Sequence, residues 1–278
     1  MPILHAIVLG ALQGLTEFFP VSSSGHLVIV PWLFGWDDFE GNESLAKAFD
    51  VALHIGTLVA VVSYFRHELW RYARAGLGSL VRPSRPLAGD ARMAWLLALS
   101  AVPAAVVGAA LSGVVEELDN RIGLVAAMLI VFGVVLALAD RLPRRRSADD
   151  WGARDATRMG LAQAIALIPG VSRSGITMSV ARVAGYDRDG AARLAFLMSV
   201  PIIAGAGLFK GIQVGLDGGI PSEFRAAFVV GALTAAVTGW IAVWATLRIV
   251  RTRSFTPFVV ERIALGALAL FLLAAGLR

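Results

Sequence analysis

The stretch Val171-Ser172-Arg173-Ser174-Gly175 (VSRSG) nearly repeats an earlier one, Val21-Ser22-Ser23-Ser24-Gly25 (VSSSG). The residues that precede the two stretches match at the same spacing: Gly10 and Gln13 before the first, Gly160 and Gln163 before the second. A polar phrase that recurs with its flanking residues in an apolar chain indicates an internal duplication.

Apolar residues make up 57% of the chain and charged residues 16%, a balance that fits no class of soluble globular protein. The apolar residues fall in long runs, and a run of about 20 is what a helix needs to cross a hydrocarbon core. Six runs approach that length: Phe49–Phe65, Met93–Val115, Gly123–Ala139, Ala192–Phe209, Ala226–Leu247 and Pro257–Leu277. The sequence therefore predicts an all-α integral membrane protein with six transmembrane helices. The chain has no cysteine, which excludes disulfides, thiolate metal sites and a cysteine nucleophile.

Charged residues alternate in sign from loop to loop. Arginines gather in segments 66–92, 141–158, 182–193 and 248–253, whereas Asp and Glu mark segments 37–43, 116–119 and 217–223. The positive-inside rule places the basic loops in the cytoplasm, so we expect six crossings with both chain termini outside. The net charge of +5 then reflects membrane insertion rather than nucleic-acid binding, and no nucleic-acid partner is expected.

Two stretches, Ile3–Leu33 and Met159–Val183, must return to the side on which they start for this alternation to hold. Each has an apolar arm, a tip of Pro, Gly and Ser, and a second apolar arm. An arm of ~15 residues covers about 22 Å, less than the ~30 Å core, so we predict two re-entrant helix-loop-helix hairpins. Three crossings follow each hairpin, and because three is odd the second half is inverted relative to the first. We expect one membrane domain, 1–278, with repeat halves 1–147 and 148–278 and the two tips meeting near the midplane.

Each tip carries groups that attract anions. An apolar helix follows each tip, which places serine hydroxyls and free backbone N–H groups at a helix N-terminus. Arg173 adds a planar guanidinium that suits phosphate oxygens. Serine and glycine could serve only as helix caps and close-packing residues. Capping does not explain Arg173, because an arginine at membrane depth costs at least a few kcal/mol unless it is paired or solvated.

The polar residues around the first tip complete a candidate site. Gln13 and Glu17 are four residues apart and share one helical face, and His26 lies one turn beyond the tip. A carboxylate, an imidazole, several hydroxyls and the Arg173 guanidinium converging on one point indicate catalysis. The alternative is that Glu17 and Arg173 form an ion pair that only clasps the two hairpins together.

Two further polar pairs lie within predicted spans. Asp50 and His54, four residues apart on the first crossing, could support the site or simply satisfy each other. Glu261 and Arg262 lie near the end of the last span, and for Arg262 we expect a structural role, by snorkelling to the interface or sealing the bundle.

These residues resemble a known family. Gln13–His26 (QGLTEFFPVSSSGH) resembles the first signature of the bacterial undecaprenyl-diphosphate phosphatases, the bacitracin-resistance family, and Pro169–Thr177 (PGVSRSGIT) resembles the second. Phe49–Thr57 (FDVALHIGT) resembles the first crossing of that family, and the similarity extends over essentially the whole chain. The resemblance implies an enzyme of the bacterial cytoplasmic (inner) membrane that removes one phosphate from undecaprenyl diphosphate. The product, undecaprenyl phosphate, is the lipid carrier recycled in cell-wall (peptidoglycan) synthesis.

The resemblance also implies a divalent cation, Mg²⁺ or Ca²⁺, which we expect Glu17 to hold together with Gln13 and the diphosphate. This family's first signature begins with Glu or Gln, and because Gln13 stands there, Glu17 is its only carboxylate. The expected catalytic residues are Glu17, Ser23, His26 and Arg173. The expected substrate-binding residues are Gln13, Ser22, Ser24, Ser172, Ser174 and Thr177.

Ser23 is the candidate nucleophile, with His26 three residues on and able to reach its hydroxyl or the leaving oxygen. Attack by serine, by histidine or by an activated water stays open at this stage. The polyprenyl diphosphate should lie between the hairpins with its tail in the lipid bilayer, and the acidic loops place cleavage on the outer (periplasmic) face.

A transporter or lipid flippase is the competing function, because inverted repeats whose broken helices meet at the midplane are typical of secondary transporters. The cluster of Glu, Ser, His and Arg exceeds what passage of an anion needs and favours an enzyme. The sequence does not fix the oligomeric state, and a homodimer is compatible with it.

Overall fold

The structure is a computed structural model, and it describes residues 1–81, 87–111, 113, 118, 121–216 and 219–277. Within these residues the chain forms eleven α-helices and one short 3-10 helix, and no β-strand. The fold is therefore all-α, as predicted. Several residues used above to argue topology lie outside the described residues: Arg82, Arg85, Val115, Glu116, Glu117, Asp119 and Asp217.

Six helices are long and apolar enough to cross a membrane. They are α3 (Glu43–Tyr64), α5 (Gly89–Ala110), α7 (Ile122–Asp140), α10 (Arg188–Leu216), α11 (Ser222–Thr252) and α12 (Thr256–Ala274). Each coincides with one of the six predicted spans, which confirms a multi-pass membrane protein. Helices α10 and α11 are longer than the apolar runs that predicted them. Helix α10 continues for two turns beyond its run, and α11 begins one turn before its run.

Four shorter helices form the two predicted helix-tip-helix units. The first unit consists of α1 (Ile3–Phe18) and α2 (Ser23–Phe34), and the second of α8 (Ala153–Ile165) and α9 (Arg173–Val183). The longest of the four has 16 residues and the shortest has 11. At 1.5 Å per residue, even the longest covers only about 24 Å.

Helix α4 (Arg66–Val81) is an element that the sequence did not predict, because its arginines mark a basic loop. It packs on α5, where Gly76 approaches Ala94, and several of its apolar side chains, including Trp70 and Leu77, are exposed. The helix is amphipathic, so charged residues interrupt its apolar residues and it contains no continuous apolar run by which it could be predicted. The 3-10 helix (Ala148–Asp150) belongs to the linker between α7 and α8.

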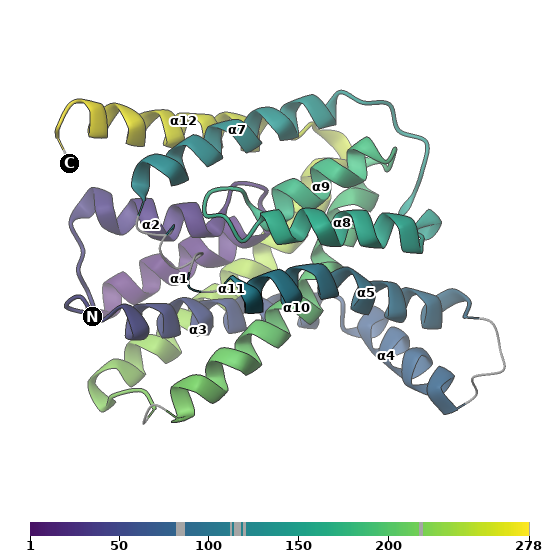
Figure 1. Cartoon of the computed structure of the whole chain (residues 1–278), viewed down its shortest axis with the longest axis horizontal. Coiled ribbons are helices and arrows are strands. Elements are labelled where there is room, and N and C mark those ends of the chain that lie inside the picture. Colours follow the sequence, from purple (N-terminus) through teal and green to yellow (C-terminus); the bar gives the residue numbers. More distant parts are fainter. Residues whose placement is uncertain (82–86, 112, 114–117, 119–120, 217–218, 278) are drawn as a thin grey trace.

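The first arm of each helix-tip-helix unit packs against a helix from the other half of the chain. Helix α1 lies on α11 and α3, and α8 lies on α5 (Figure 1). Glycine makes both contacts possible: a Cβ at Gly10 would lie 2.4 Å from the carbonyl oxygen of Gly231, and one at Gly160 would lie 2.5 Å from that of Ser100. The repeated glycines of the sequence are therefore positions of close helix packing.

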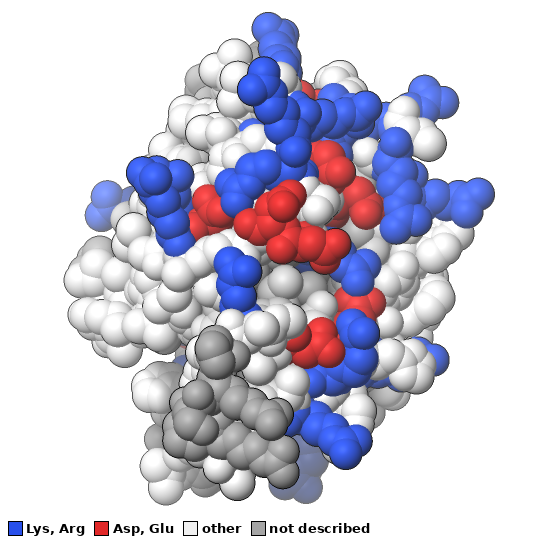
Figure 2. Space-filling model, turned by 90° about the vertical axis from the view of Figure 1, so that its right-hand side faces the viewer, with Lys and Arg blue, Asp and Glu red and all other residues white. Residues whose placement is uncertain are grey.

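The ends of the chain lie at one end of the bundle, and the linker between α7 and α8 lies at the opposite end (Figure 1). That opposite end also carries α4. Seen face-on, it presents many Lys and Arg side chains around a group of Asp and Glu (Figure 2). Between the two ends, Phe18 of α1 packs edge-on against Phe196 of α10 with ring centroids 5.3 Å apart, so the core joins the two halves beneath the tips.

Candidate active site

The two tips have the same backbone. Ser22 and Ser172 are the N-caps of α2 and α9, and both have left-handed backbone conformations, with φ of 77° and 73°. Each side chain accepts a hydrogen bond from the glycine three residues on, Gly25 N at 3.3 Å and Gly175 N at 3.0 Å. A non-glycine residue with positive φ is strained, and such strain is retained only where the surroundings hold it in place.

The tips touch each other directly. The Ser174 hydroxyl donates to the Phe19 carbonyl at 3.2 Å, and the Gly170 N–H donates to the Ser24 hydroxyl at 3.5 Å. Because residues of opposite halves meet here, the structure brings together the two motifs that the sequence repeats.

Arg262 joins both tips from α12. Its buried guanidinium donates to the carbonyl of Pro20 in the first tip at 3.2 Å and to those of Gly170 and Val171 in the second, both at 2.9 Å. It also donates to Leu129 O on α7 at 3.3 Å. The structural role expected for Arg262 is confirmed, but its position is within the core and not at an interface, and the acceptors could not have been named from sequence.

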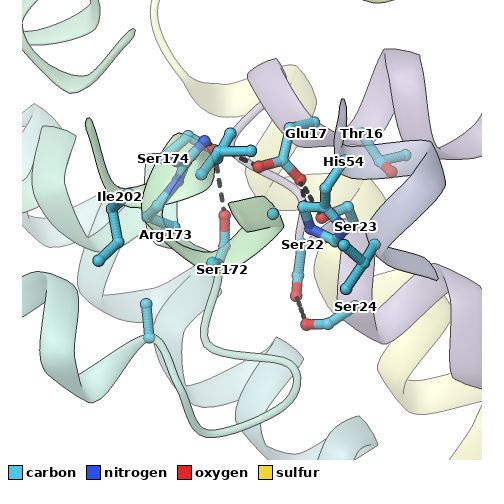
Figure 3. A pocket seen from close by; sticks show the side chains of 15 residues that line it. Thr16, Glu17, Ser22, Ser23, Ser24, His54, Ser172, Arg173, Ser174 and Ile202 are labelled. Atoms are coloured by element: carbon cyan, nitrogen blue, oxygen red, sulfur yellow. Dashed lines mark hydrogen bonds and ion pairs between the residues drawn. The ribbon is translucent and has the colours of Figure 1, made fainter. Parts of the chain in front are cut away.

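Glu17 lies at the centre of a cavity of about 260 Å³ between the tips (Figure 3). Its carboxylate is largely buried, and Oε2 accepts hydrogen bonds from Ser23 Oγ and from Gln13 Nε2, the latter at 3.0 Å. Its other oxygen, Oε1, lies 2.7 Å from Arg173 Nη2. The carboxylate and the guanidinium of the two motifs therefore form an ion pair, which is the contact that the sequence predicted.

Serine hydroxyls surround this ion pair. Those of Ser22 and Ser24 are 3.3 Å apart, and those of Ser172 and Ser174 are also 3.3 Å apart. The two tips together place five serines on the cavity wall: Ser22, Ser23, Ser24, Ser172 and Ser174. Arg173 also donates to Ser199 O at 3.3 Å, which fixes the guanidinium plane from the α10 side.

Three of the expected site residues do not line the cavity. His26 turns toward α12, where Nε2 lies 2.7 Å from Glu261 Oε1, and its Nδ1 lies 2.8 Å from the backbone oxygen of Ser22. Thr177 donates back along its own helix to Arg173 O at 2.7 Å. Gln13 reaches the cavity only through Glu17. These three side chains lie behind the cavity wall and hold parts of it in place.

His54 occupies the place expected of His26. It lines the cavity, and its Nε2 lies 3.6 Å from Glu17 Oε2. Its Nδ1 lies 2.8 Å from the backbone oxygen of Asp50, so the contact between these residues runs through the main chain. The sequence left open whether Asp50 and His54 support the site or satisfy each other; the structure places the His54 imidazole at the site, through the packing of α3 against α1.

The cavity is lined by apolar as well as polar residues. Val51, Ala166, Ile202, Ile203 and Ala206 add apolar surface to its lining. A second cavity of about 560 Å³ shares Ser24 and His54 with the first and has polar residues around it, among them Asp37 and Asn42. A site that combines polar donors with hydrocarbon surface suits an amphiphile with an anionic head.

Known proteins resemble this chain along its whole length. Residues 6–268 match the family described as bacitracin resistance protein BacA. A protein of Nocardioides sp. named undecaprenyl-diphosphatase is 47% identical, with 98% of this chain and 97% of that protein aligned. Proteins with the same name from Pelobacter propionicus (44% identical, 100% and 99% aligned) and Thermomicrobium roseum (42%, 97% and 98%) are similar to it as well.

Proposed function

The chain belongs to the bacitracin resistance protein BacA family, and we propose that it hydrolyses undecaprenyl diphosphate to undecaprenyl phosphate and inorganic phosphate. The ion pair of Glu17 and Arg173 in a cavity lined by serines of both tips carries this proposal. The activity would return the lipid carrier to cell-wall synthesis. The apolar residues of the cavity lining give the start of the polyprenyl tail a place beside the anionic head.

In this proposal, Arg173 and the N-termini of α2 and α9 bind the diphosphate oxygens. Hydrolysis of a phosphoanhydride depends mainly on positioning and on neutralising charge, and fixed donors in a site with little water supply both. Ser22, Ser24, Ser172 and Ser174 add hydroxyl donors.

Ser23 is the proposed nucleophile. As its Oγ bonds to the terminal phosphorus, the bridging P–O bond breaks and its electron pair leaves with undecaprenyl phosphate. The hydroxyl proton passes to Glu17 Oε2, which already accepts the Ser23 hydrogen bond. Water then hydrolyses the phosphoserine. If instead a water held beside Ser23 attacks, Glu17 accepts the proton of that water. His26 and Thr177 act in both versions by holding the tips.

A divalent cation, Mg²⁺ or Ca²⁺, is part of the proposal. Gln13 Oε1 is buried and has no hydrogen-bond partner among the described residues, so an acceptor stands ready beside the Glu17 carboxylate. Oxygen donors of this kind suit both ions. Within the described part of the chain, no three His, Asp or Glu side chains are close enough to hold a metal. Glu17 and Gln13 would therefore hold the ion together with the substrate, and the ion would neutralise phosphate charge.

We further propose that the two helix-tip-helix units are re-entrant and that halves 1–147 and 148–278 form an inverted repeat. The matching φ values of Ser22 and Ser172 and the exchanged packing of α1 on α11 and α8 on α5 support this arrangement. With the arginine-rich end in the cytoplasm of a bacterial cell, both termini and the opening of the site would face the outside of the inner membrane.

Liposomes that carry undecaprenyl diphosphate test the function. Purified protein should release phosphate from lipid of the outer leaflet, and Arg173→Ala and Glu17→Ala should abolish release while the protein stays folded. Lipid translocation is scored separately in the same vesicles. Translocation of the lipid without phosphate release would contradict the proposed hydrolysis and indicate a transporter.

A further inference from the structure

A second polar cavity lies at the arginine-rich end of the bundle, away from the tips. It has a volume of about 280 Å³ and lies where α7 ends and where the loop from α9 enters α10. We name it the arginine pocket, and its lining consists of Asp140, Arg141, Leu142, Pro143, Arg144, Arg182 and Arg188. Four guanidinium groups thus face one carboxylate.

The single carboxylate is already fully engaged. Asp140 accepts two hydrogen bonds from Arg188, at Nε (2.6 Å) and Nη2 (3.1 Å), and a third from the Phe255 backbone N–H at 3.1 Å. Arg182 Nε lies 3.8 Å from the same carboxylate. One negative charge therefore serves two close arginines, and the lining of the arginine pocket has an excess of three positive charges, although the Asp187 carboxylate outside the lining also attracts Arg182.

Three other arginines at this end each have a carboxylate of their own. Arg146 pairs with Asp155 (2.6 Å), Arg251 with Asp189 (2.7 Å), and Arg193 with Glu68. Figure 2 shows Asp and Glu side chains among the Lys and Arg side chains at this end. In the arginine pocket four arginines share one lining carboxylate, and charges of one sign crowded in a partly enclosed space repel each other unless an anion joins them.

The interior of the pocket is rigid and its rim is open. Arg182 is buried and donates to the backbone oxygens of Asp140 (3.1 Å), Leu142 and Tyr186, which fixes the floor. Arg141 and Arg144 are exposed at the rim, so their guanidinium groups can turn toward a ligand. The fork of an arginine matches the spacing of phosphate oxygens, and two free forks above a fixed cationic floor suit one phosphate group.

We propose that the arginine pocket binds a phosphate group at the arginine-rich end of the protein, in addition to the catalytic site. A basic pocket between helices at the cytoplasmic surface is a common site for an anionic lipid head group. A phosphate group could come from such a head group or from free inorganic phosphate, and the pocket accepts the same chemistry in both cases. Binding would tie the end of α7, in the first half, to α9 and α10, in the second.

Full-length protein tests this with two probes and a matched control. The test variant is Arg141→Gln with Arg144→Gln, and the control is Arg154→Gln with Arg158→Gln, which removes the same charge from exposed positions in α8. Retention of phosphatidylglycerol is measured by native mass spectrometry against phosphatidylcholine. Thermal protection by inorganic phosphate is measured against chloride at equal ionic strength.

We expect the test variant to retain phosphatidylglycerol about tenfold more weakly than the parent, with the control near the parent. That result identifies a lipid head group as the ligand. If only inorganic phosphate discriminates between test and control variants, free phosphate is the ligand. Equal weakening of both variants would mean general attraction to a basic surface, and equal behaviour of the test variant and parent would mean no site; either result overturns the proposal. Phosphatase activity of the parent is assayed in parallel, so that failure of the proposed function is seen separately.

Discussion

The two tips share a frame and differ in chemistry. Ser22 and Ser172 have the same strained backbone, and each accepts a hydrogen bond from the glycine three residues on. In each tip the hydroxyl of this serine lies 3.3 Å from that of the serine two residues on. Between those paired hydroxyls the first tip has Ser23 and the second has Arg173.

The arms before the tips differ in the same way. Glu17 precedes the first tip, and Leu167 holds the corresponding position before the second. One tip therefore supplies a carboxylate and a candidate nucleophile, and the other supplies the cation. Duplication would leave both tips able to present hydroxyls and N–H groups. Divergence at two positions, 17/167 and 23/173, would then place different catalytic groups on the two tips. This division requires that the tips touch, since neither has the whole set.

The largest expected effect comes from exchanging the two unlike residues. Glu17→Arg or Arg173→Glu alone buries two like charges, so each single variant should be unstable and inactive. The double variant should regain stability because the pair is restored in reverse. Its phosphate release should remain about 10³-fold or more below the parent, because the cation then lies on the wrong tip.

Thermal unfolding in detergent and phosphate release from undecaprenyl diphosphate measure the two properties. Activity of the double variant within tenfold of the parent would show that the pair is only a clasp between the hairpins, the alternative that the sequence left open.

The six crossings and the two tips could be predicted from sequence, because each depends on a local pattern of residues. Apolar runs fix the six crossings, and the repeated Gly, Gln and Ser spacing fixes the tips. The contact between Glu17 and Arg173 could be predicted because the two tips were expected to meet. Residues that act across the fold could not be found in this way.

His54 and Arg262 illustrate what escapes a local pattern. Each lies on a membrane-spanning helix, and its target is a carboxylate or backbone carbonyl on another element. The sequence around each residue does not predict which other element its side chain will contact. His26 shows the converse: proximity to Ser23 in sequence indicated a contact, but the turn of α2 directs the imidazole to Glu261.

The next effect isolates the centre of the first tip. Ser23→Ala should lower the turnover rate about 10²- to 10³-fold if Ser23 is the nucleophile. Ser174→Ala in the second tip removes a hydroxyl from the same cavity and should cost tenfold or less, since other donors remain. Single-turnover phosphate release measures both variants. A Ser23→Ala enzyme within a few-fold of the parent would assign the attack to water.

Arg262 tests whether the two tips must be held in register. Arg262→Met leaves the carbonyls of Pro20, Gly170 and Val171 buried without their donor, at a cost of about 1–3 kcal/mol for each group that stays unpaired. We expect a clear loss of thermal stability and about tenfold lower turnover, with Arg262→Lys in between because lysine restores some of the donors. Arg253→Met, at an exposed position after α11, is the control and should change neither property.

The smallest effect concerns the frame itself. Ser22→Ala and Ser172→Ala each remove a cap and keep a methyl-bearing residue at positive φ, so each should destabilise the protein by about 1–2 kcal/mol. Ser22→Gly and Ser172→Gly also lose the cap but relieve the strained backbone, and they should stay within about 0.5 kcal/mol of the parent. Denaturant unfolding in mild detergent gives the four values. Because the two tips have the same backbone and the same cap, each substitution should lower the free energy of unfolding equally in either tip, to within about 0.5 kcal/mol. A clearly larger loss in one tip would mean that only that tip depends on its serine for stability. The two tips would then share a backbone conformation but not its contribution to stability.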